Sequence, residues 1–153
     1  MVAMNIFKAL ICLDYYNLRI QNRTREAGSG SVHRIGIAWI CNILTIGGGY
    51  FIYFKLHNQP DVVYDTLYQL HYYELAGRVI MMVLLTIIYL IAFTIYGDKA
   101  TIQSTLKTYI GLPSDRQERI AKNASRYFTI SLILFLAVAS TLVYLFKIQP
   151  TVV

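Results

Sequence analysis

Three long apolar stretches dominate the pattern of hydrophobic and polar positions along the chain. They cover residues 35–54, 78–96 and 129–146, and Arg78, at the edge of the second, is their only Asp, Glu, Lys or Arg. An uncharged apolar segment of about 20 residues is long enough to cross the hydrocarbon core of a bilayer as an α-helix. The pattern therefore predicts an all-α integral membrane protein with three transmembrane helices.

A different pattern precedes the first stretch. Over about residues 3–22, apolar positions recur at steps of three and four, while polar residues interrupt the other sides of the segment. This spacing predicts an amphipathic helix. Such a helix lies in the membrane interface or docks on a partner protein, and the sequence leaves both readings open. The shared apolar face consists of Met4, Phe7, Ile11, Tyr15 and Leu18.

The segment 23–34 is polar and carries Gly28, Ser29, Gly30 and Ser31 at its centre. This composition is typical of a flexible linker. We therefore expect two parts: an N-terminal interfacial helix with its linker over 1–34, and a three-helix membrane domain over 35–153.

Aromatic residues lie where the predicted spans meet water. Trp39 is near one end of the first span, and Tyr64, Tyr68 and Tyr72 recur at steps of four on one face of a short helix predicted over 60–76. Tyr and Trp combine an apolar ring with a polar group and gather at membrane interfaces. We expect these four residues to be interfacial.

The region between the second and third spans predicts two more elements. Residues 98–113 form a short amphipathic helix that Gly111 and Pro113 end. Ser114 to Gln117 then has the form of a capping box that opens a long helix running into the third span. The apolar side of the short helix comprises Ile102, Leu106, Tyr109 and Ile110.

Within the first span, Asn42 and a run of glycines stand out. Asn42 is the one strongly polar side chain there and is expected to form a hydrogen bond to another helix. Gly47, Gly48 and Gly49 favour close packing of a second helix, with the approach of a quinone or other ligand to the bare backbone as the alternative.

Composition supports a membrane protein, and charge indicates its orientation. The chain is 56% hydrophobic and 14% charged, with a mean hydropathy of +0.48 and a net charge of +6. Basic residues concentrate before the first span and between the second and third. The positive-inside rule then places the N-terminus inside, in the matrix or cytoplasm, and the C-terminus outside.

Four of these basic residues form a stripe at steps of three and four: Arg116, Arg119, Lys122 and Arg126. Such a stripe holds an anionic phospholipid such as cardiolipin or an acidic partner, or is ordinary positive flanking of a span. No nucleic-acid partner is expected, because the net charge has this membrane explanation.

Candidate catalytic groups are scarce. None of His33, His57 and His71 lies within a predicted span, which disfavours a haem held by two histidines, and Cys12 and Cys41 match no metal spacing. The spans carry no ionisable group at depth, so a pump or ion-coupled transporter is disfavoured. We expect neither enzyme activity nor a cofactor.

The sequence therefore predicts a non-catalytic accessory or structural subunit of a multi-subunit inner-membrane complex, a respiratory-chain or other energy-transducing assembly being favoured. One alternative is a small homo-oligomeric transporter or channel component, with Asn42, Thr45 and the three glycines lining its path. A second alternative is a membrane enzyme or a quinone- or lipid-binding protein that uses His71, Tyr72 and Glu74.

Overall fold

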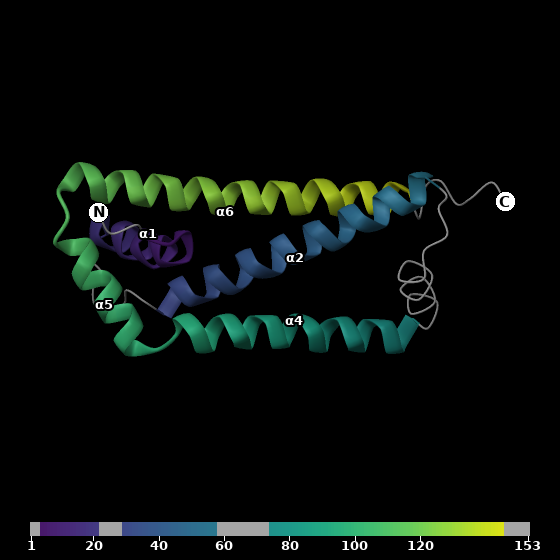
Figure 1. Cartoon of the computed structure of the whole chain (residues 1–153), viewed down its shortest axis with the longest axis horizontal. Helices are drawn as coiled ribbons and strands as arrows, with labels where there is room; N and C mark the ends of the chain where they lie inside the picture. The colour runs from purple at the N-terminus through teal and green to yellow at the C-terminus, as the bar shows by residue number, and fades with distance from the viewer. Residues whose placement is uncertain (1–3, 22–28, 58–73, 146–153) are drawn as a thin grey trace.

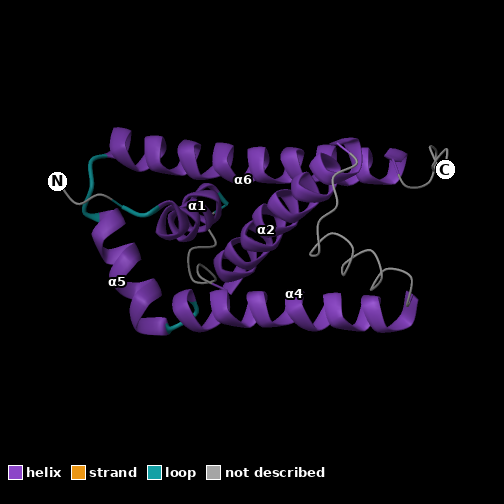
Figure 2. Ribbon diagram, turned by 45° about the vertical axis from the view of Figure 1, so that its right-hand side comes forward, coloured by secondary structure: helices purple, strands orange, loops and turns teal. Residues whose placement is uncertain are grey.

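The structure is a computed structural model that describes residues 4–21, 29–57 and 74–145. Every regular element in these ranges is a helix (Figure 2). The elements are α1 (Ile6–Ile20), α2 (Ser29–His57), α4 (Glu74–Tyr96), α5 (Lys99–Ile110) and α6 (Ser114–Val143). The predicted helix over 60–76, including Tyr64, Tyr68 and Tyr72, falls almost entirely outside the described residues.

Three of the helices are long and apolar enough to cross a membrane: α2, α4 and α6. They contain 29, 23 and 30 residues. At about 1.5 Å per residue their lengths are roughly 43, 34 and 45 Å, more than the hydrocarbon core requires. The prediction of an all-α membrane protein with three spans is confirmed, as is the long helix that carries the third span.

The three long helices form an open frame (Figure 1). Helices α4 and α6 run along the long axis of the molecule, and α2 crosses diagonally between them and packs against both. The end that holds α1, α5, the start of α2, the end of α4 and the start of α6 is called the cap end below. The other end holds the end of α2 and the start of α4.

The buried core lies at the cap end, and α1 is at its centre. Leu10, Ile11 and Cys12 of α1 are fully buried, and the helix packs against α2, α5 and α6. The sequence predicted an amphipathic helix that lies in the membrane interface or docks on a partner protein, whereas its buried face packs against this chain's own helices. Periodicity shows that a face is apolar but not what covers it. The rest of the core cluster comprises Ala9, Leu13, Ile35, Ala38, Ala92, Tyr96, Ala121 and Ala124.

Side chains cap the two short helices at their first residues. The Oδ1 atom of Asn5 accepts from the backbone N–H of Phe7 at 3.2 Å, where α1 begins. Asp98 does the same for Thr101 at the start of α5. Both bonds satisfy N–H groups that have no partner inside the helix. The predicted short helix over 98–113 is thus present as α5, although Ile110 is 51% exposed.

Two local predictions are wrong. Residues 29–34 are not a flexible linker, because α2 already begins at Ser29, where the carboxylate of Asp14 lies against its first turn. Ser114 does not start a capping box either. Pro113 occupies the N-cap position of α6, and its ring has no polar group that could form a side-chain cap bond. The amide of Gln117, the other member of the predicted box, donates instead to the carbonyl of Ile110 in α5.

Candidate functional site

An ion pair connects α1 to the start of α2. Asp14 is 5% exposed, and its Oδ1 lies 3.4 Å from Nη1 of Arg34. A Cβ added at Gly30 would lie only 3.3 Å from the same oxygen. The carboxylate therefore sits beside the first turn of α2, where the positive end of the helix dipole stabilises an anion. We assign this pair a role in positioning α1.

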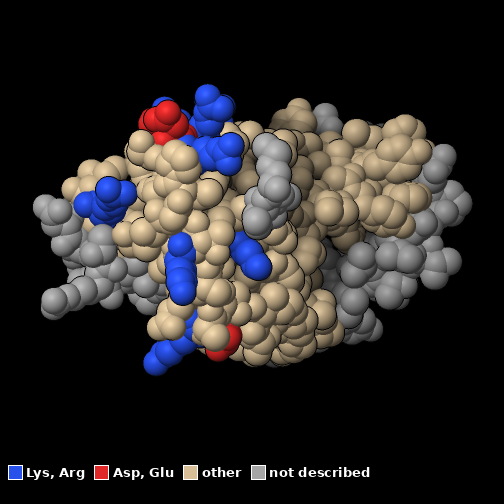
Figure 3. All heavy atoms as spheres, turned by 60° about the vertical axis from the view of Figure 1, so that its left-hand side comes forward, with Lys and Arg blue, Asp and Glu red and all other residues tan. Residues whose placement is uncertain are grey.

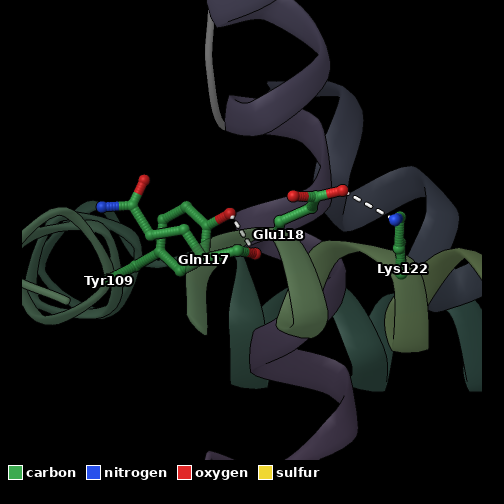
Figure 4. A network of polar contacts seen from close by, with 4 residues as sticks. All are labelled: Tyr109, Gln117, Glu118 and Lys122. Carbon is green, nitrogen blue, oxygen red and sulfur yellow. Dashed lines mark hydrogen bonds and ion pairs between the residues drawn. The ribbon is translucent and has the colours of Figure 1, made fainter. Parts of the chain in front are cut away.

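Gln117 connects α1, α5 and α6. Its Nε2 donates to the carbonyls of Ile110 at 3.1 Å and Leu112 at 2.8 Å, at the end of α5. Its Oε1 accepts from Arg19 of α1 at 3.2 Å. Its backbone carbonyl accepts from the hydroxyl of Tyr109 at 2.8 Å (Figure 4). These bonds pair carbonyls that α5 leaves without helical partners.

Phe7 of α1 contacts one aromatic ring from each long helix. Its ring centroid lies 5.6 Å from that of Trp39 on α2, 5.8 Å from Tyr96 on α4 and 6.1 Å from Tyr127 on α6. Edge-on and tilted contacts of this kind add to the stability that burial alone provides.

Trp39 was predicted to be interfacial. In the structure its ring packs within the chain, and its buried Nε1 has no hydrogen-bond partner among the described residues.

Asn42 connects α2 to α6 within the membrane segment, and Gly48 lies at a second contact of the same helices. The amide of Asn42 donates to the hydroxyl of Tyr127 at 2.6 Å. A Cβ added at Gly48 would lie 2.4 Å from Cγ1 of Val138. A Cβ added at Gly47 or Gly49 would meet no described atom within 4 Å outside its own stretch of helix. Of the three glycines, Gly48 faces α6, because consecutive helical residues point about 100° apart; close packing of another helix at Gly47 and Gly49 stays a prediction.

Each of the two described histidines has a hydrogen-bond partner within the chain. Nδ1 of His33 and the hydroxyl of Tyr89 form a hydrogen bond between α2 and α4, which sequence reasoning missed because the two residues lie far apart in the chain. Nδ1 of His57 bonds the carbonyl of Tyr53 at 2.9 Å. No three His, Cys, Asp or Glu side chains of the described residues are grouped as a metal site. His71 lies outside the described residues, and Glu74 is the first residue of α4.

The basic stripe of Arg116, Arg119, Lys122 and Arg126 is exposed along the first half of α6. Figure 3, which brings the cap end forward, shows Lys and Arg side chains gathered there. Lys122 pairs with Glu118 at 2.6 Å (Figure 4). The opposite side of the helix carries the buried residues Gln117, Ala121 and Ala124, so the stripe points away from the chain.

A hollow of about 320 Å³ lies between α1 and the start of α2. Its two ionisable lining residues, Asp14 and Arg34, already pair with each other. Its other lining residues are Asn17, Leu18, Ile20 and Gln21. This lining offers no nucleophile with an adjacent base, so it supplies no recognisable catalytic arrangement.

Cys12 provides a probe of α1 docking. It is fully buried, and its thiol donates to the sulfur of Met4 at 3.5 Å. Burial raises the pKa of the Cys12 thiol from 9.0 to about 12. In a Cys41→Ala background we expect Cys12 to resist a water-soluble maleimide near neutral pH in mild detergent and to react readily in SDS, because the thiolate is the reactive form. Fast labelling of the folded protein would contradict the packing of α1.

The same shift predicts alkaline destabilisation. The folded state holds the thiol proton more tightly than the unfolded state, so this stabilisation is complete below pH 9 and is lost as pH rises toward 12. Burial also raises the pKa of Tyr109, which adds to the effect. Cys12→Ala should therefore lose less stability over this range than the parent protein, as measured by SDS-driven unfolding.

Most of these contacts join residues that are distant in the sequence; Arg19 and Gln117, for example, are 98 positions apart. Periodicity within one helix carries no signal for such pairs.

Comparison with protein-family models, with curated proteins and with solved structures yields no match to this chain.

Proposed function

We propose that this protein is a non-catalytic accessory subunit of a multi-subunit inner-membrane complex, and that the exposed sides of α4 and α6 pack against other membrane subunits. A respiratory-chain or other energy-transducing assembly is the favoured host. The observation that carries the proposal is how little of these two spans the chain itself covers.

Only 11% of the most apolar window of α4 and 6% of that of α6 is buried within the chain. Met82 of α4 is 68% exposed and Ile133 of α6 is 59% exposed. The chain's own core is at the cap end. The two spans thus retain long apolar surfaces on which further transmembrane helices can pack.

The outer half of α6 favours a protein neighbour over lipid alone. Ala137, Ser140 and Thr141 are exposed and lie on one side of the helix. Small residues let the backbones of two membrane helices approach closely, and a hydroxyl such as that of Ser140 can bond across them. The Thr141 hydroxyl donates to the carbonyl of Ala137 in its own helix. The proposed path of a transporter is less well supported, because Asn42 bonds to Tyr127 of α6 and Val138 covers Gly48.

Charge supports an orientation for the proposed subunit. The cap end carries the basic stripe together with Lys8, Lys99 and Lys107. The positive-inside rule favours this end on the matrix side of a mitochondrial inner membrane or the cytoplasmic side of a bacterial one. The C-terminus would then lie outside.

Photo-crosslinking tests the proposal in native membranes. A photoreactive amino acid at Ser140, or at Met82 on α4, should yield adducts of discrete mass with other polypeptides. The same group at Gln103, exposed on α5, serves as a control outside the spans. On native gels the chain should migrate well above its own 17.5 kDa. Adducts of only twice the chain mass would favour the homo-oligomeric alternative, and a monomer without adducts would contradict the proposal.

A further inference from the structure

One side of α6 changes from basic to apolar without any break in the helix. Arg119, Lys122 and Arg126 fall within about 60° of one another around the axis at about 100° per residue, and Ile130 and Ile133 continue the same side. All five are exposed, with Ile130 at 56% and Ile133 at 59%. From the N-terminal end of α6 onward, this side of the helix therefore carries basic side chains first and apolar side chains next.

The arginines of this side are available to an anion. Lys122 is paired with Glu118, whereas no carboxylate in the described part of the chain forms an ion pair with Arg119 or Arg126. The guanidinium group matches the geometry of a phosphate and binds it with two parallel hydrogen bonds. The two arginines are about 10.5 Å apart along the axis, so both reach toward the phosphates of one headgroup region.

We infer that this side of α6 binds an anionic phospholipid of the inner leaflet, with phosphates at Arg119 and Arg126 and acyl chains along Ile130 and Ile133. A leaflet is about 15 Å of hydrocarbon, which corresponds to about 10 residues of helix. The acyl chains therefore extend from Arg126 to about Leu136. The small residues from Ala137 onward lie in the other leaflet, so the lipid and the proposed protein neighbour do not compete.

A lipid fits this surface better than an acidic protein segment does. An acidic segment complements the charge of the arginines, but it offers no apolar surface to cover Ile130 and Ile133, which follow them along α6. A phospholipid supplies an anionic headgroup for the arginines and acyl chains for the isoleucines, in the same order along α6. The inference is independent of the proposed function, because an isolated chain can bind the lipid.

Native mass spectrometry of the purified full chain in detergent tests the inference. Cardiolipin should bind more tightly than phosphatidylcholine. The double variant Arg119→Gln/Arg126→Gln should weaken cardiolipin binding about 30-fold, since each cation near an anionic surface contributes about fivefold. The control Lys99→Gln/Lys107→Gln removes the same charge from exposed positions of α5 and should change binding by less than about threefold.

Both double variants should retain the helicity and SDS resistance of the parent, because all four side chains are exposed. Equal losses in the two double variants would overturn the inference, because net charge alone would then account for binding. Equal affinity for cardiolipin and phosphatidylcholine would overturn it as well. Binding of a soluble poly-glutamate peptide in place of cardiolipin would identify an acidic partner and also contradict it.

Discussion

Leu10→Ala is expected to lower the free energy of unfolding by about 2–5 kcal/mol, the usual cost of removing a fully buried leucine side chain from a packed core. Leu10 has no exposed surface, and it lies on α1 within the cluster that also contains residues of α2, α4 and α6. The cavity would weaken the cluster in which α1 packs with residues of all three long helices. SDS-driven unfolding followed by circular dichroism measures the loss.

The docking of α1 can be followed separately in this variant. With Cys41→Ala as background, Leu10→Ala should increase maleimide labelling of Cys12, which has no exposed surface in the folded protein. Ile20→Ala is the matched control, because Ile20 ends the same helix and is 69% exposed. If both variants unfold at the same SDS concentration, α1 is not part of the stabilising core.

Gly48→Leu is expected to separate α2 from α6 beyond the cap end. A Cβ at this position would meet Val138 at 2.4 Å and Leu142 at 3.1 Å. Valine is β-branched and has few other rotamers in a helix, so it cannot move aside easily. Overpacking of this kind costs about 1–3 kcal/mol or forces the helices apart. A disulfide-trapping or spin-label distance between the two helices, together with SDS resistance, measures the displacement.

The neighbouring glycines provide controls of the same size and depth. Gly47→Leu and Gly49→Leu add the same side chain to the same helix, but neither added Cβ would lie within 4 Å of a described atom outside its own stretch of α2. Each should leave the distance between α2 and α6 unchanged and keep or slightly raise stability, because glycine is a poor helix former. Equal effects at all three positions would show that the loss of glycine flexibility, and not the contact with Val138, controls the packing.

Much of the architecture follows from local pattern. Hydrocarbon selects uncharged segments of about 20 residues and requires them to be helical, so three apolar stretches predict three spans. Local pattern also predicted α1 and α5, because apolar positions recur at helical spacing in both. In the structure each helix begins with a side-chain cap, at Asn5 and Asp98. The capping box at Ser114 failed because Gln117 bonds to carbonyls at the end of α5, a competition that no pattern inside one helix can show.

The candidate site was predictable only in part. The basic stripe on α6 can be read from spacing, because residues three and four apart share a helical face. Its exposure cannot, because only packing shows that Gln117 and Ala121 face inward. Likewise, the sequence does not distinguish which of three adjacent glycines contacts another helix. The diagonal crossing of α2 places Gly48 against α6.

By itself, then, the sequence determined the fold class, the three spans and the distribution of charge, since these depend on how each segment partitions between water and hydrocarbon. The tertiary structure alone decided that α1 is buried against its own chain, that Asp14 pairs with Arg34 and Arg19 with Gln117, and that α4 and α6 remain largely uncovered. Those features depend on which surfaces meet in three dimensions, and contacts between distant residues leave no periodic trace along the chain.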